Sequence, residues 1–576
     1  MINNKLFTSL TLMGLFVFSS CNLDLTPEDT LSPKTYFKNG PQLELWANHF
    51  YSLLPDADDL AKQNADDNIS SELGETLMGQ RSAASEDGWN WDRLRDINYY
   101  LQHSNQCSDE NARKHYDGVA YFFRAYFYFE KVKRYGDVPW YDQVLNSNED
   151  KLLAKPRQDR ELIMDSVMKD LDRAITMLPV KKDPVHVTKW TALAFKSRAA
   201  LYEGTFRKSR GMNNYEKYLK QAADAGEEFI NNSGYKLYTK GAEPYRTLFN
   251  SIDAVSDEVI LTKKYSNTSN VRHSIPFNII IYRQGFTKRF MNHYLMSDGS
   301  RFDEQPGWQT MGYVAETKHR DPRLSQTVLC PGYVQVDASK ETVNDLSALT
   351  GYRPIKFVNA SPYDGSLKAI TDYPLFRAAE VYLNFAEAKA ELGTLSQIDL
   401  DKSINKIRDR VGMPHLNMLA ANTTPDNLLL QYYPNVTKNT NTGVILEIRR
   451  ERTVELALEG FRLWDIFRWK EGQQLTKEFD GCYFPGPGEY DLNEDGIADI
   501  LLYTTNKGNF KGASFKIGKD IILTNNTSGN IHALSNITIS WDENRDYLWP
   551  IPASERVLTS GALTQNPGWT DTTNFN

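Results

Sequence analysis

The chain has 576 residues and a mass of 65.9 kDa, with 40% hydrophobic, 24% charged and 12% aromatic residues. This composition excludes a disordered chain and a polytopic membrane protein, because the sequence can bury a large core and its mean hydropathy is −0.54. The net charge is −8, so there is no basic excess to neutralise phosphates, and a nucleic-acid partner is not expected.

A short apolar segment at the N-terminus has the pattern of a targeting signal. Lys5 precedes an apolar run over residues 6–18, which is too short to cross a bilayer because spanning takes about 20 apolar residues. Two serines stand directly before Cys21, as in the lipobox of bacterial lipoproteins, where the cysteine becomes the acylated first residue of the mature chain. We expect a signal peptide over 1–20, lipidation at Cys21 and a tether over 21–40. The alternative is an ordinary signal peptide with an incidental cysteine.

The other cysteines limit covalent cross-linking. With Cys21 lipidated, Cys107, Cys330 and Cys482 allow at most one intramolecular disulfide. No C-x-x-C pattern occurs, so neither a zinc-ribbon nor a thioredoxin-like site is expected. A chain of this size can fold on its hydrophobic core without disulfides or bound metal ions.

Helical patterns dominate the first half of the chain. Apolar residues recur at steps of three and four over 111–135, 162–178, 188–203 and 215–230. Gly204 follows the third pattern directly and is predicted to end that helix. Aromatic residues are paired with alanines where two helices would cross closely. This resembles tetratricopeptide-type hairpins, although no strict 34-residue repeat is present.

The helical pattern returns over 378–392, 403–411 and 444–459. The segments 241–374 and 471–576 are rich in Gly, Pro, Asn, Asp and Tyr, and we expect long loops there with scattered short strands. The sequence therefore predicts a mostly α fold, a tetratricopeptide-like helical hairpin scaffold with long loop-rich insertions and a few short strands. The predicted parts of the body over 41–576 are a scaffold over about 41–235 and 375–470, ligand-facing loops over 241–374, and a loop-rich C-terminal part over 471–576.

The segment 444–469 is dense in charge and admits two interpretations. Glu447 and Arg450, like Arg452 and Glu455, stand three residues apart, a spacing at which helical side chains are neighbours. One interpretation is a catalytic carboxylate cluster. We favour the other, a buried or half-buried ion network between packed helices, since arginine and glutamate side chains commonly satisfy one another.

Four stretches of the chain carry a family resemblance. They are 133–139 (KRYGDVP), 377–388, 444–469, and 547–552 (YLWPIP) with 563–569 after it. Together with the lipobox, these stretches resemble the SusD/RagB family of outer-membrane nutrient-binding lipoproteins. The motifs extend over nearly the whole mature chain. The resemblance implies a helical body with four tetratricopeptide-like pairs and a loop-rich face.

The same resemblance implies a place and a partner. The protein would be lipid-anchored at the cell surface, on the outer face of a Gram-negative outer membrane. It would cover a SusC-like TonB-dependent outer-membrane transporter as a lid. Cargo in this family is usually an oligosaccharide, and some members handle peptides. Family members bind their cargo and do not cleave it.

The ligand site has to be argued from chemistry. Sugars present apolar C–H faces, which match Trp and Tyr rings, and hydroxyls, which match Asn, Asp and Arg side chains. Two loop regions, 64–98 and 282–308, have this composition. We expect Trp89 and Trp308 to be the stacking platforms, and we expect the helix-like stretch after Trp91 to point that ring inward. The other candidate ligand residues are Asn68, Arg81, Tyr282, Arg283, Tyr294 and Arg301. The alternative is that these side chains anchor loops to the body.

One acidic loop has the spacing of a calcium site. Its first nine positions place oxygen donors at 1, 3, 5 and 9, a glycine at the sharp turn, and a backbone carbonyl at 7. Position 12 is Leu502 rather than the bidentate glutamate of an EF-hand, so affinity would be weaker. The alternative is an Asp/Asn/Gly-rich turn without metal. No cofactor is required otherwise. The predicted calcium ligands are Asp491, Asn493, Asp495, Ile497 and Asp499.

Signatures of common enzyme classes are missing from the sequence. It contains no H-E-x-x-H, no G-x-x-x-x-G-K-[ST] and no G-x-S-x-G motif. The number of Asp and Glu residues does not exclude a catalytic pair of carboxylates like that of glycosidases, because both residue types are abundant. Three hypotheses follow: a glycan-binding lid that feeds an importer, the same lid with a peptide cargo, and a surface glycoside hydrolase. We expect the first, and no enzyme activity.

Overall fold

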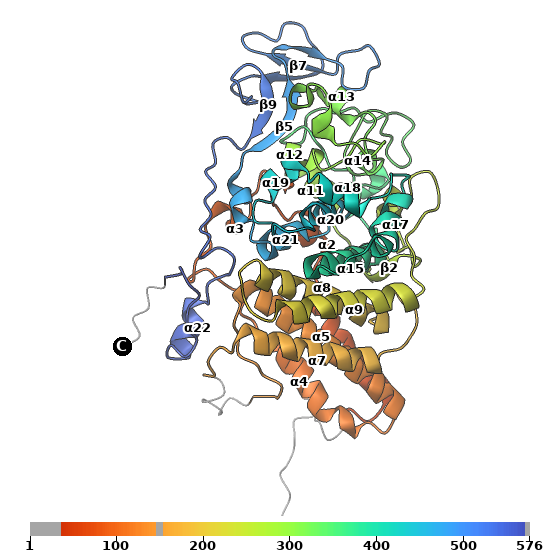
Figure 1. The fold of residues 1–576 in the computed structure, drawn as a ribbon, viewed down its shortest axis with the longest axis vertical. Helices are drawn as coiled ribbons and strands as arrows, with labels where there is room; N and C mark the ends of the chain where they lie inside the picture. Colours follow the sequence, from red (N-terminus) through yellow and green to blue (C-terminus); the bar gives the residue numbers. More distant parts are fainter. Residues whose placement is uncertain (1–35, 146–153, 571–576) are drawn as a thin grey trace, which may run out of the picture.

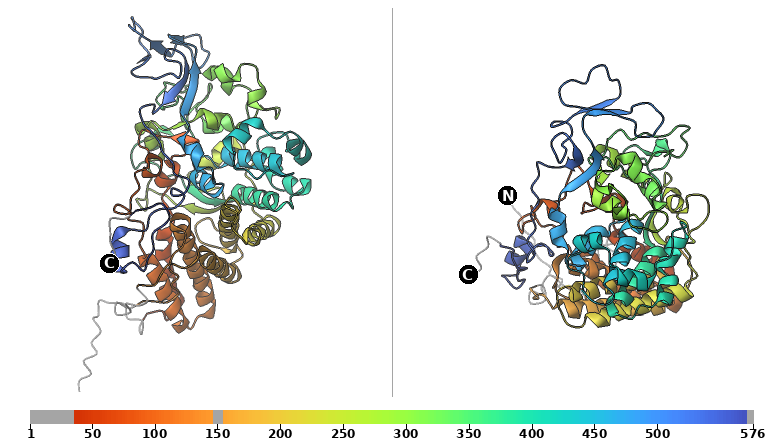
Figure 2. Two further views of the ribbon diagram at one scale, coloured as in Figure 1. Left: turned by 60° about the vertical axis from the view of Figure 1, so that its left-hand side comes forward. Right: turned by 45° about the horizontal axis from the view of Figure 1, so that its top comes forward.

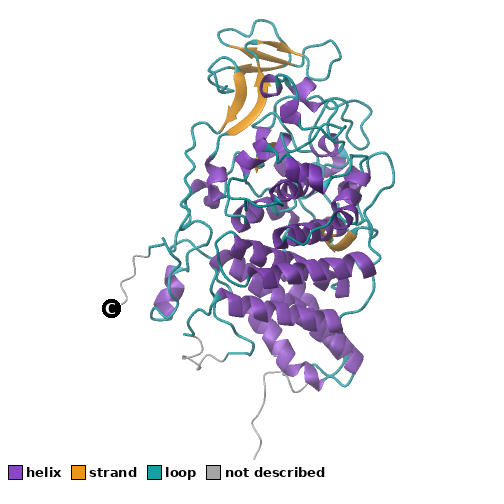
Figure 3. Cartoon of the chain, in the orientation of Figure 1, coloured by secondary structure: helices purple, strands orange, loops and turns teal. Residues whose placement is uncertain are grey.

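The computed structural model describes residues 36–145 and 154–570. The predicted signal peptide and the predicted lipidation at Cys21 lie outside the described residues. Helices fill the lower half of the molecule, whereas the upper half consists largely of loops and short helices (Figure 1). Most strands gather at the upper end (Figure 3). Two further views show the same arrangement of a helical base beneath a loop-rich body (Figure 2).

Six longer helices pack side by side in the order α5, α7, α8, α9, α15 and α20. The predicted helical ranges agree with these to within a few residues, because each helix buries the apolar face that its sequence pattern defines. The prediction of a mostly α fold built on helical hairpins is confirmed. The bounds are α5 (Glu110–Tyr135), α7 (Arg160–Met177), α8 (Lys189–Lys208), α9 (Tyr215–Asn232), α15 (Ala378–Leu392) and α20 (Thr442–Glu455).

The prediction that Gly204 ends a helix is wrong, because α8 continues through it to Lys208. A Cβ atom at Gly204 would lie 2.8 Å from the Cδ2 atom of Leu219 and 3.0 Å from its backbone nitrogen. The missing side chain therefore lets α8 and α9 approach closely, and this packing outweighs the helix-breaking tendency of glycine. Gly393 behaves as a terminating glycine does, since it follows α15 in the left-handed conformation with φ 76°.

The segment 241–374 contains more helix than predicted. Its helices have only four to seven residues, too few to show a helical period in the sequence. They are α10 (Pro244–Asn250), α11 (Ile275–Ile281), α12 (Lys288–Met291), α13 (Tyr313–Thr317) and α14 (Arg323–Thr327), with 3₁₀ turns η3 (Phe302–Glu304), η4 (Trp308–Thr310) and η5 (Ser361–Tyr363).

The remaining helical elements flank the long helices. At the N-terminal side they are α1 (Gly40–Asn48), η1 (His49–Leu53), α2 (Ala57–Ala61), α3 (Glu75–Met78), α4 (Asp92–His103) and η2 (Ser104–Gln106). At the C-terminal side they are α16 (Gln397–Asp401), α17 (Ile404–Asp409), α18 (Met418–Thr423), α19 (Asn427–Tyr432), α21 (Arg462–Arg468), η6 (Gly472–Thr476) and α22 (Ala553–Leu558).

The strands form small separate sheets, as expected for scattered short strands. Strand β1 (Asn68–Ile69) pairs with β3 (Gly285–Phe286), and β2 (Val259–Lys263) pairs with β4 (Tyr373–Arg377), both antiparallel. Strand β5 (Phe479–Phe484) pairs antiparallel with β9 (Gly529–Ala533). Between these two in the chain lies a three-stranded sheet of β6 (Gly488–Tyr490), β7 (Ile500–Tyr503) and β8 (Ala513–Lys516).

The charged segment forms a buried ion network, as favoured from the sequence. All residues of α20 are buried. Glu455 pairs with Arg410 at 2.5 Å and with Arg377 at 2.7 Å. The predicted pair Glu447–Arg450 is present at 3.2 Å. The predicted pair of Arg452 with Glu455 is wrong.

Each member of that second pair has a stronger partner elsewhere in the fold. The Arg452 guanidinium binds Asp465 of α21 at 2.7 Å. Glu455 instead meets guanidinium groups from three other segments. Spacing along one helix does not reveal these long-range partners.

The helices and the cysteines bear on membrane spanning and on disulfide formation. Among the described residues, every helix is too short or too polar to span a lipid bilayer. Cys107, Cys330 and Cys482 are all buried free thiols, and burial raises the pKa of the Cys330 thiol to about 12.

Candidate functional site

The fold brings the two predicted ligand loops together. Strand β1 belongs to the loop region 64–98, and its partner β3 belongs to the region 282–308. The backbone N–H of Ser71 also donates to the carbonyl oxygen of Tyr282 at 2.8 Å. This pairing places the Tyr282 side chain beside residues that lie more than 200 positions earlier in the chain.

A cleft of about 400 Å³ opens where these loops meet, and we call it the central cleft. Its volume lies within the range of roughly 300–1,000 Å³ that is typical of small-molecule sites. Three half-buried aromatic rings line it: Tyr282, Trp464 and Trp549. The polar residues of its wall are Asp59, Lys62, Gln63, Asn64, Ser70, Glu72 and Thr76.

The two tryptophans are held from behind. Trp464 belongs to α21, and its ring centroid lies 5.6 Å from that of Trp549 with the planes inclined by 30°. The Lys133 ammonium lies 4.3 Å from the Trp464 ring, and the Arg81 guanidinium lies 4.5 Å from the Trp549 ring. Such cation–π contacts fix the rings before a ligand arrives.

Burial lowers the pKa of both cations that support the tryptophan rings, Lys133 and Arg81. It lowers the pKa of Lys133, although Glu130 at 2.8 Å acts in the opposite direction. It lowers the pKa of Arg81 to about 10, against the attraction of Asp546, which lies 3.1 Å away. Arg81 does not line the central cleft, and its guanidinium positions the Trp549 ring from behind.

The wall of the central cleft contains polar side chains, some of whose atoms are shielded from solvent. The Asn64 side-chain amide donates to the carbonyl oxygen of Glu72 at 3.0 Å, which fixes its orientation. The Oδ1 atom of Asn64 and the Oε1 atom of Gln63 are buried without a hydrogen-bond partner. Rings for an apolar face beside polar side chains for hydroxyls are the combination that sugar binding requires.

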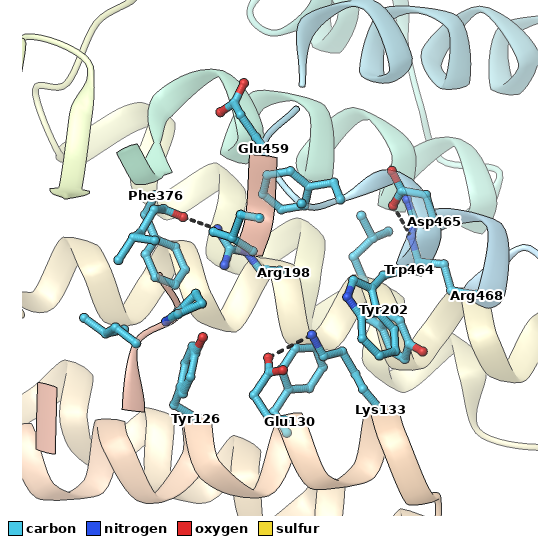
Figure 4. Close-up of a pocket in the computed structure, with 18 of the residues that line it drawn as sticks. Tyr126, Glu130, Lys133, Arg198, Tyr202, Phe376, Glu459, Trp464, Asp465 and Arg468 are labelled. Atoms are coloured by element: carbon cyan, nitrogen blue, oxygen red, sulfur yellow. Dashed lines mark hydrogen bonds and ion pairs between the residues drawn. The ribbon is translucent and has the colours of Figure 1, made fainter. Parts of the chain in front are cut away.

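A smaller cavity lies behind Trp464 and is a poor candidate. Its volume is about 120 Å³, below the range of typical ligand sites. Figure 4 shows Trp464 on one side of it and Tyr126, Glu130 and Lys133 along its floor. The charged groups around it already satisfy one another, as in the pair of Asp465 with Arg468 at 2.9 Å. We interpret it as an internal packing space.

A second cleft of about 550 Å³ lies between α4, the loop 139–145 and α22, and we call it the lateral cleft. Trp89, Trp91 and Tyr141 line it. Trp89 is only 8% exposed, and its ring packs edge-on against Tyr135 with centroids 4.9 Å apart. Trp91, expected to point inward, is half-buried, so part of its ring faces the cleft.

Several other predicted ligand residues do not line either cleft. Tyr294 is fully buried, and Asn68 is 1% exposed within β1. The Arg301 guanidinium lies 3.4 Å from the Asp426 carboxylate. Arg283 is exposed, and its Nε donates to the carbonyl oxygen of Ser347 at 3.2 Å.

Trp308, expected to be a stacking platform, is half-buried in η4. Its ring centroid lies 6.2 Å from that of Phe302. Trp308 lines neither cleft, and of the predicted ligand residues Tyr282 alone lines the central cleft.

Trp464 and Trp549 were not predicted as ligand residues. Both belong to the stretches that carry the family resemblance, which lie outside the two loop regions chosen because their composition suits sugars. The missing information was tertiary, because only the fold shows that one part of each ring remains exposed at the point where 62–77 meets Tyr282.

The acidic loop 491–499 has a preformed turn geometry. The Asp491 carboxylate accepts backbone N–H groups of Glu494 at 2.6 Å and Gly496 at 2.7 Å. Asp495 accepts the N–H of Ile497 at 2.8 Å, and Asp499 accepts that of Leu492 at 2.7 Å. These hydrogen bonds are compatible with either of the two interpretations made from the sequence.

Calcium binding at this loop stays a prediction. We expect Ca²⁺ to raise the melting temperature of the protein, since a ligand that binds only the folded state at 100 times its Kd stabilises it by about 2.7 kcal/mol. The Asp495→Ala variant should lose this response, and Mg²⁺ should not reproduce it. Elemental analysis that recovers no calcium, together with no thermal shift, would contradict the prediction.

Comparisons with known proteins agree with this fold. A family model described as "SusD family" matches residues 257–569, and one described as "Starch-binding associating with outer membrane" matches residues 62–201. A SusD-like protein of Formosa agariphila is 24% identical over 538 residues, covering 83% of this chain and 94% of that protein.

Solved structures resemble the whole chain. A SusD-like protein from Bacteroides fragilis superposes with a TM-score of 0.69 at 22% identity, covering 94% of this chain and all of the other. A SusD-like carbohydrate-binding protein from the same species superposes with a TM-score of 0.68 at 20% identity, covering 91% of this chain and 99% of the other. At these identities the likeness concerns the fold.

Proposed function

The chain belongs to the SusD family, and from that premise we propose that it is a surface lipoprotein that binds oligosaccharides and delivers them to a SusC-like TonB-dependent transporter. Binding to carbohydrate is supported at the level of the family, through the starch-binding model that matches residues 62–201 and the carbohydrate-binding protein of the same fold. The same family model names association with the outer membrane.

One observation carries the proposal for this chain. The central cleft combines three half-buried aromatic rings with polar side chains at the junction of the two loop regions whose composition suits sugars. Stacking on a rigid ring and hydrogen bonds from hydroxyls give modest affinity without chemical change to the ligand. The protein would therefore bind its cargo and hand it on intact.

The proposed anchor and partner follow from the sequence. Acyl chains on Cys21 would hold the protein at the membrane, since each buried CH₂ group contributes about 0.8 kcal/mol. A barrel transporter that co-purifies with the protein from native outer membranes would support the lid role. A Cys21→Ala variant that stays membrane-bound would contradict the anchor.

Replacing Tyr282 by alanine is expected to weaken oligosaccharide binding about tenfold or more, equivalent to about 1.4 kcal/mol, because the variant loses one face of the stacking site. The chain from Asn22 onward would be screened against glycan and peptide arrays that include maltooligosaccharides. The affinity of each variant would then be measured by calorimetry with the best ligand.

Tyr363→Ala is the matched control, because Tyr363 is also half-buried but lies in η5, outside both clefts. It should bind as the wild type does, and both variants should melt as the wild type does. If the arrays respond only to peptides, the cargo is a peptide and not an oligosaccharide. Release of shorter products from a labelled polysaccharide would instead indicate a hydrolase.

A further inference from the structure

A cluster of metal-ligating side chains lies on the small sheet of β5 and β9, and its three members line neither cleft. Asp480 of β5 stands directly opposite His532 of β9 in the antiparallel register. Glu478 lies two positions before Asp480, at the residue directly before β5. The ligand atoms of these three residues all lie within 4.8 Å of one another.

The opposite face of the same sheet belongs to the hydrophobic core. Phe479 and Ala533 are register partners, and both pack in a core cluster around Phe467. This burial fixes the sheet, and the alternation of side chains then places Asp480 and His532 together on the opposite face. Glu478 joins them from the residue directly before β5.

Asp480 and His532 make a long contact across the two strands. The Oδ1 atom of Asp480 and the Nδ1 atom of His532 are shielded from solvent and lie 3.5 Å apart as an ion pair, longer than the roughly 2.7–3.2 Å of a normal N–H···O bond. A ligand that bound both atoms at a shorter distance would therefore improve their pairing.

A metal ion between these atoms would satisfy both. Ligands of a tetrahedral zinc ion lie about 3.4 Å apart, because each metal–ligand bond is 2.0–2.2 Å long. The observed separation is therefore that of two ligands sharing one ion. An imidazole nitrogen beside carboxylate oxygens favours a transition metal over Ca²⁺ or Mg²⁺.

We propose that Glu478, Asp480 and His532 bind a divalent transition-metal ion, with Zn²⁺ as the natural occupant. A fourth ligand is available nearby, because Asn530 lies two positions before His532 on the same face and its buried Oδ1 atom has no partner. A water molecule could serve instead. Exposed Glu478 would complete the shell from the solvent side.

The position of this ion gives it a structural consequence. Strands β5 and β9 form the stem of a lobe, since the chain between them builds β6, β7, β8 and the acidic loop 491–499. In Figure 1 the two strands lie side by side below β7 at the upper end of the molecule. An ion bound across the stem would join both ends of the lobe and reduce its local opening.

The test uses Co²⁺ as a spectroscopic substitute for Zn²⁺. The protein from Asn22 onward would be freed of metal with a chelator and titrated with Co²⁺, whose visible absorption is intense only in tetrahedral sites. We expect one tetrahedral Co²⁺ per chain, displaced by Zn²⁺ and not by Ca²⁺. We also expect Zn²⁺ to slow amide hydrogen exchange in β5 and β9.

Three variants make the outcome decisive. Loss of a residue behind the ligands typically weakens metal binding by about 10–100-fold, so loss of a direct ligand in His532→Ala should weaken it by at least about 100-fold. Glu478→Gln, at an exposed position, should also weaken binding and serves if His532→Ala fails to fold. His415→Ala is the matched control, because His415 is an exposed histidine whose carboxylate partner is Asp409 at 2.6 Å.

His415→Ala should bind Co²⁺ as the wild type does. The proposal is overturned if the wild type shows no tetrahedral Co²⁺ spectrum. It is equally overturned if the spectrum survives unchanged in His532→Ala. Either result would mean that Asp480 and His532 form only a long ion pair and bind no metal ion.

Discussion

Glu455→Ala is expected to abolish stable folding. The carboxylate of Glu455 contacts the guanidinium groups of Arg410 at 2.5 Å, Arg377 at 2.7 Å and Arg323 at 3.2 Å, and every one of these side chains is at most 1% exposed. Removing the carboxylate would leave three cations close together in the core. Breaking one buried ion pair already costs about 3–5 kcal/mol, a large part of the roughly 5–15 kcal/mol that keeps a protein folded.

The measurement is chemical and thermal unfolding followed by circular dichroism. Glu110→Ala is the matched control, because Glu110 forms a long 3.9 Å pair with Arg113 while its side chain is 85% exposed. Such surface pairs contribute about 0–1 kcal/mol, so this variant should unfold as the wild type does. A Glu455→Ala protein that melts within a few degrees of the wild type would show that the network does not stabilise the fold.

Acid is expected to destabilise the protein progressively as the pH falls from about 4.5 towards 2. Burial alone would raise the pKa of Asp66, but the Arg462 guanidinium lowers it to about 2. Arg468 likewise overcomes burial and lowers the pKa of Glu387 to about 2. Because these pKa values are depressed in the folded state, the associated stability is present above the ordinary values of 3.8 and 4.5 and is lost as the pH falls towards 2.

The two pKa shifts give the size of this loss of stability. At about 1.4 kcal/mol for each pKa unit, Asp66 contributes about 2 kcal/mol and Glu387 about 3 kcal/mol to the free energy of unfolding at neutral pH. Urea unfolding at pH 7, 5 and 3 measures it. In Glu387→Gln the fall between pH 5 and pH 3 should be smaller by about 2 kcal/mol, because part of the contribution is lost only below pH 3. Equal free energies of unfolding at pH 7 and pH 3 in the wild type would contradict the prediction.

Between pH 7 and pH 5 two opposing effects should leave stability nearly constant. Burial raises the pKa of Asp67 and of Glu471 to about 7, so the folded protein gains stability as the pH falls below 7. Burial lowers the pKa of His273 to about 4 and holds that of His293 well below its ordinary 6.5, so stability is lost at these sites as the pH falls below 6.5. The expected profile is therefore a plateau followed by a steep acid limb.

The sequence pattern was sufficient to predict the long helices and the family. Apolar spacing located the long helices to within a few residues, and α15 spans the predicted range 378–392. These features depend on residues that are neighbours in the sequence, so local rules describe them. The motif stretches indicated the family, and the match over residues 257–569 confirmed it.

What the sequence by itself determined about this protein is thus its helical class, its family and the composition of its ligand loops. Only the tertiary structure decided which of those residues meet. Gly204 stays helical because Leu219 packs against it, Arg452 turns to Asp465, and Tyr282 joins Trp464 and Trp549 through the β1–β3 pairing. The physical reason is that each of these outcomes is set by contacts between distant segments, whose strength local spacing does not encode.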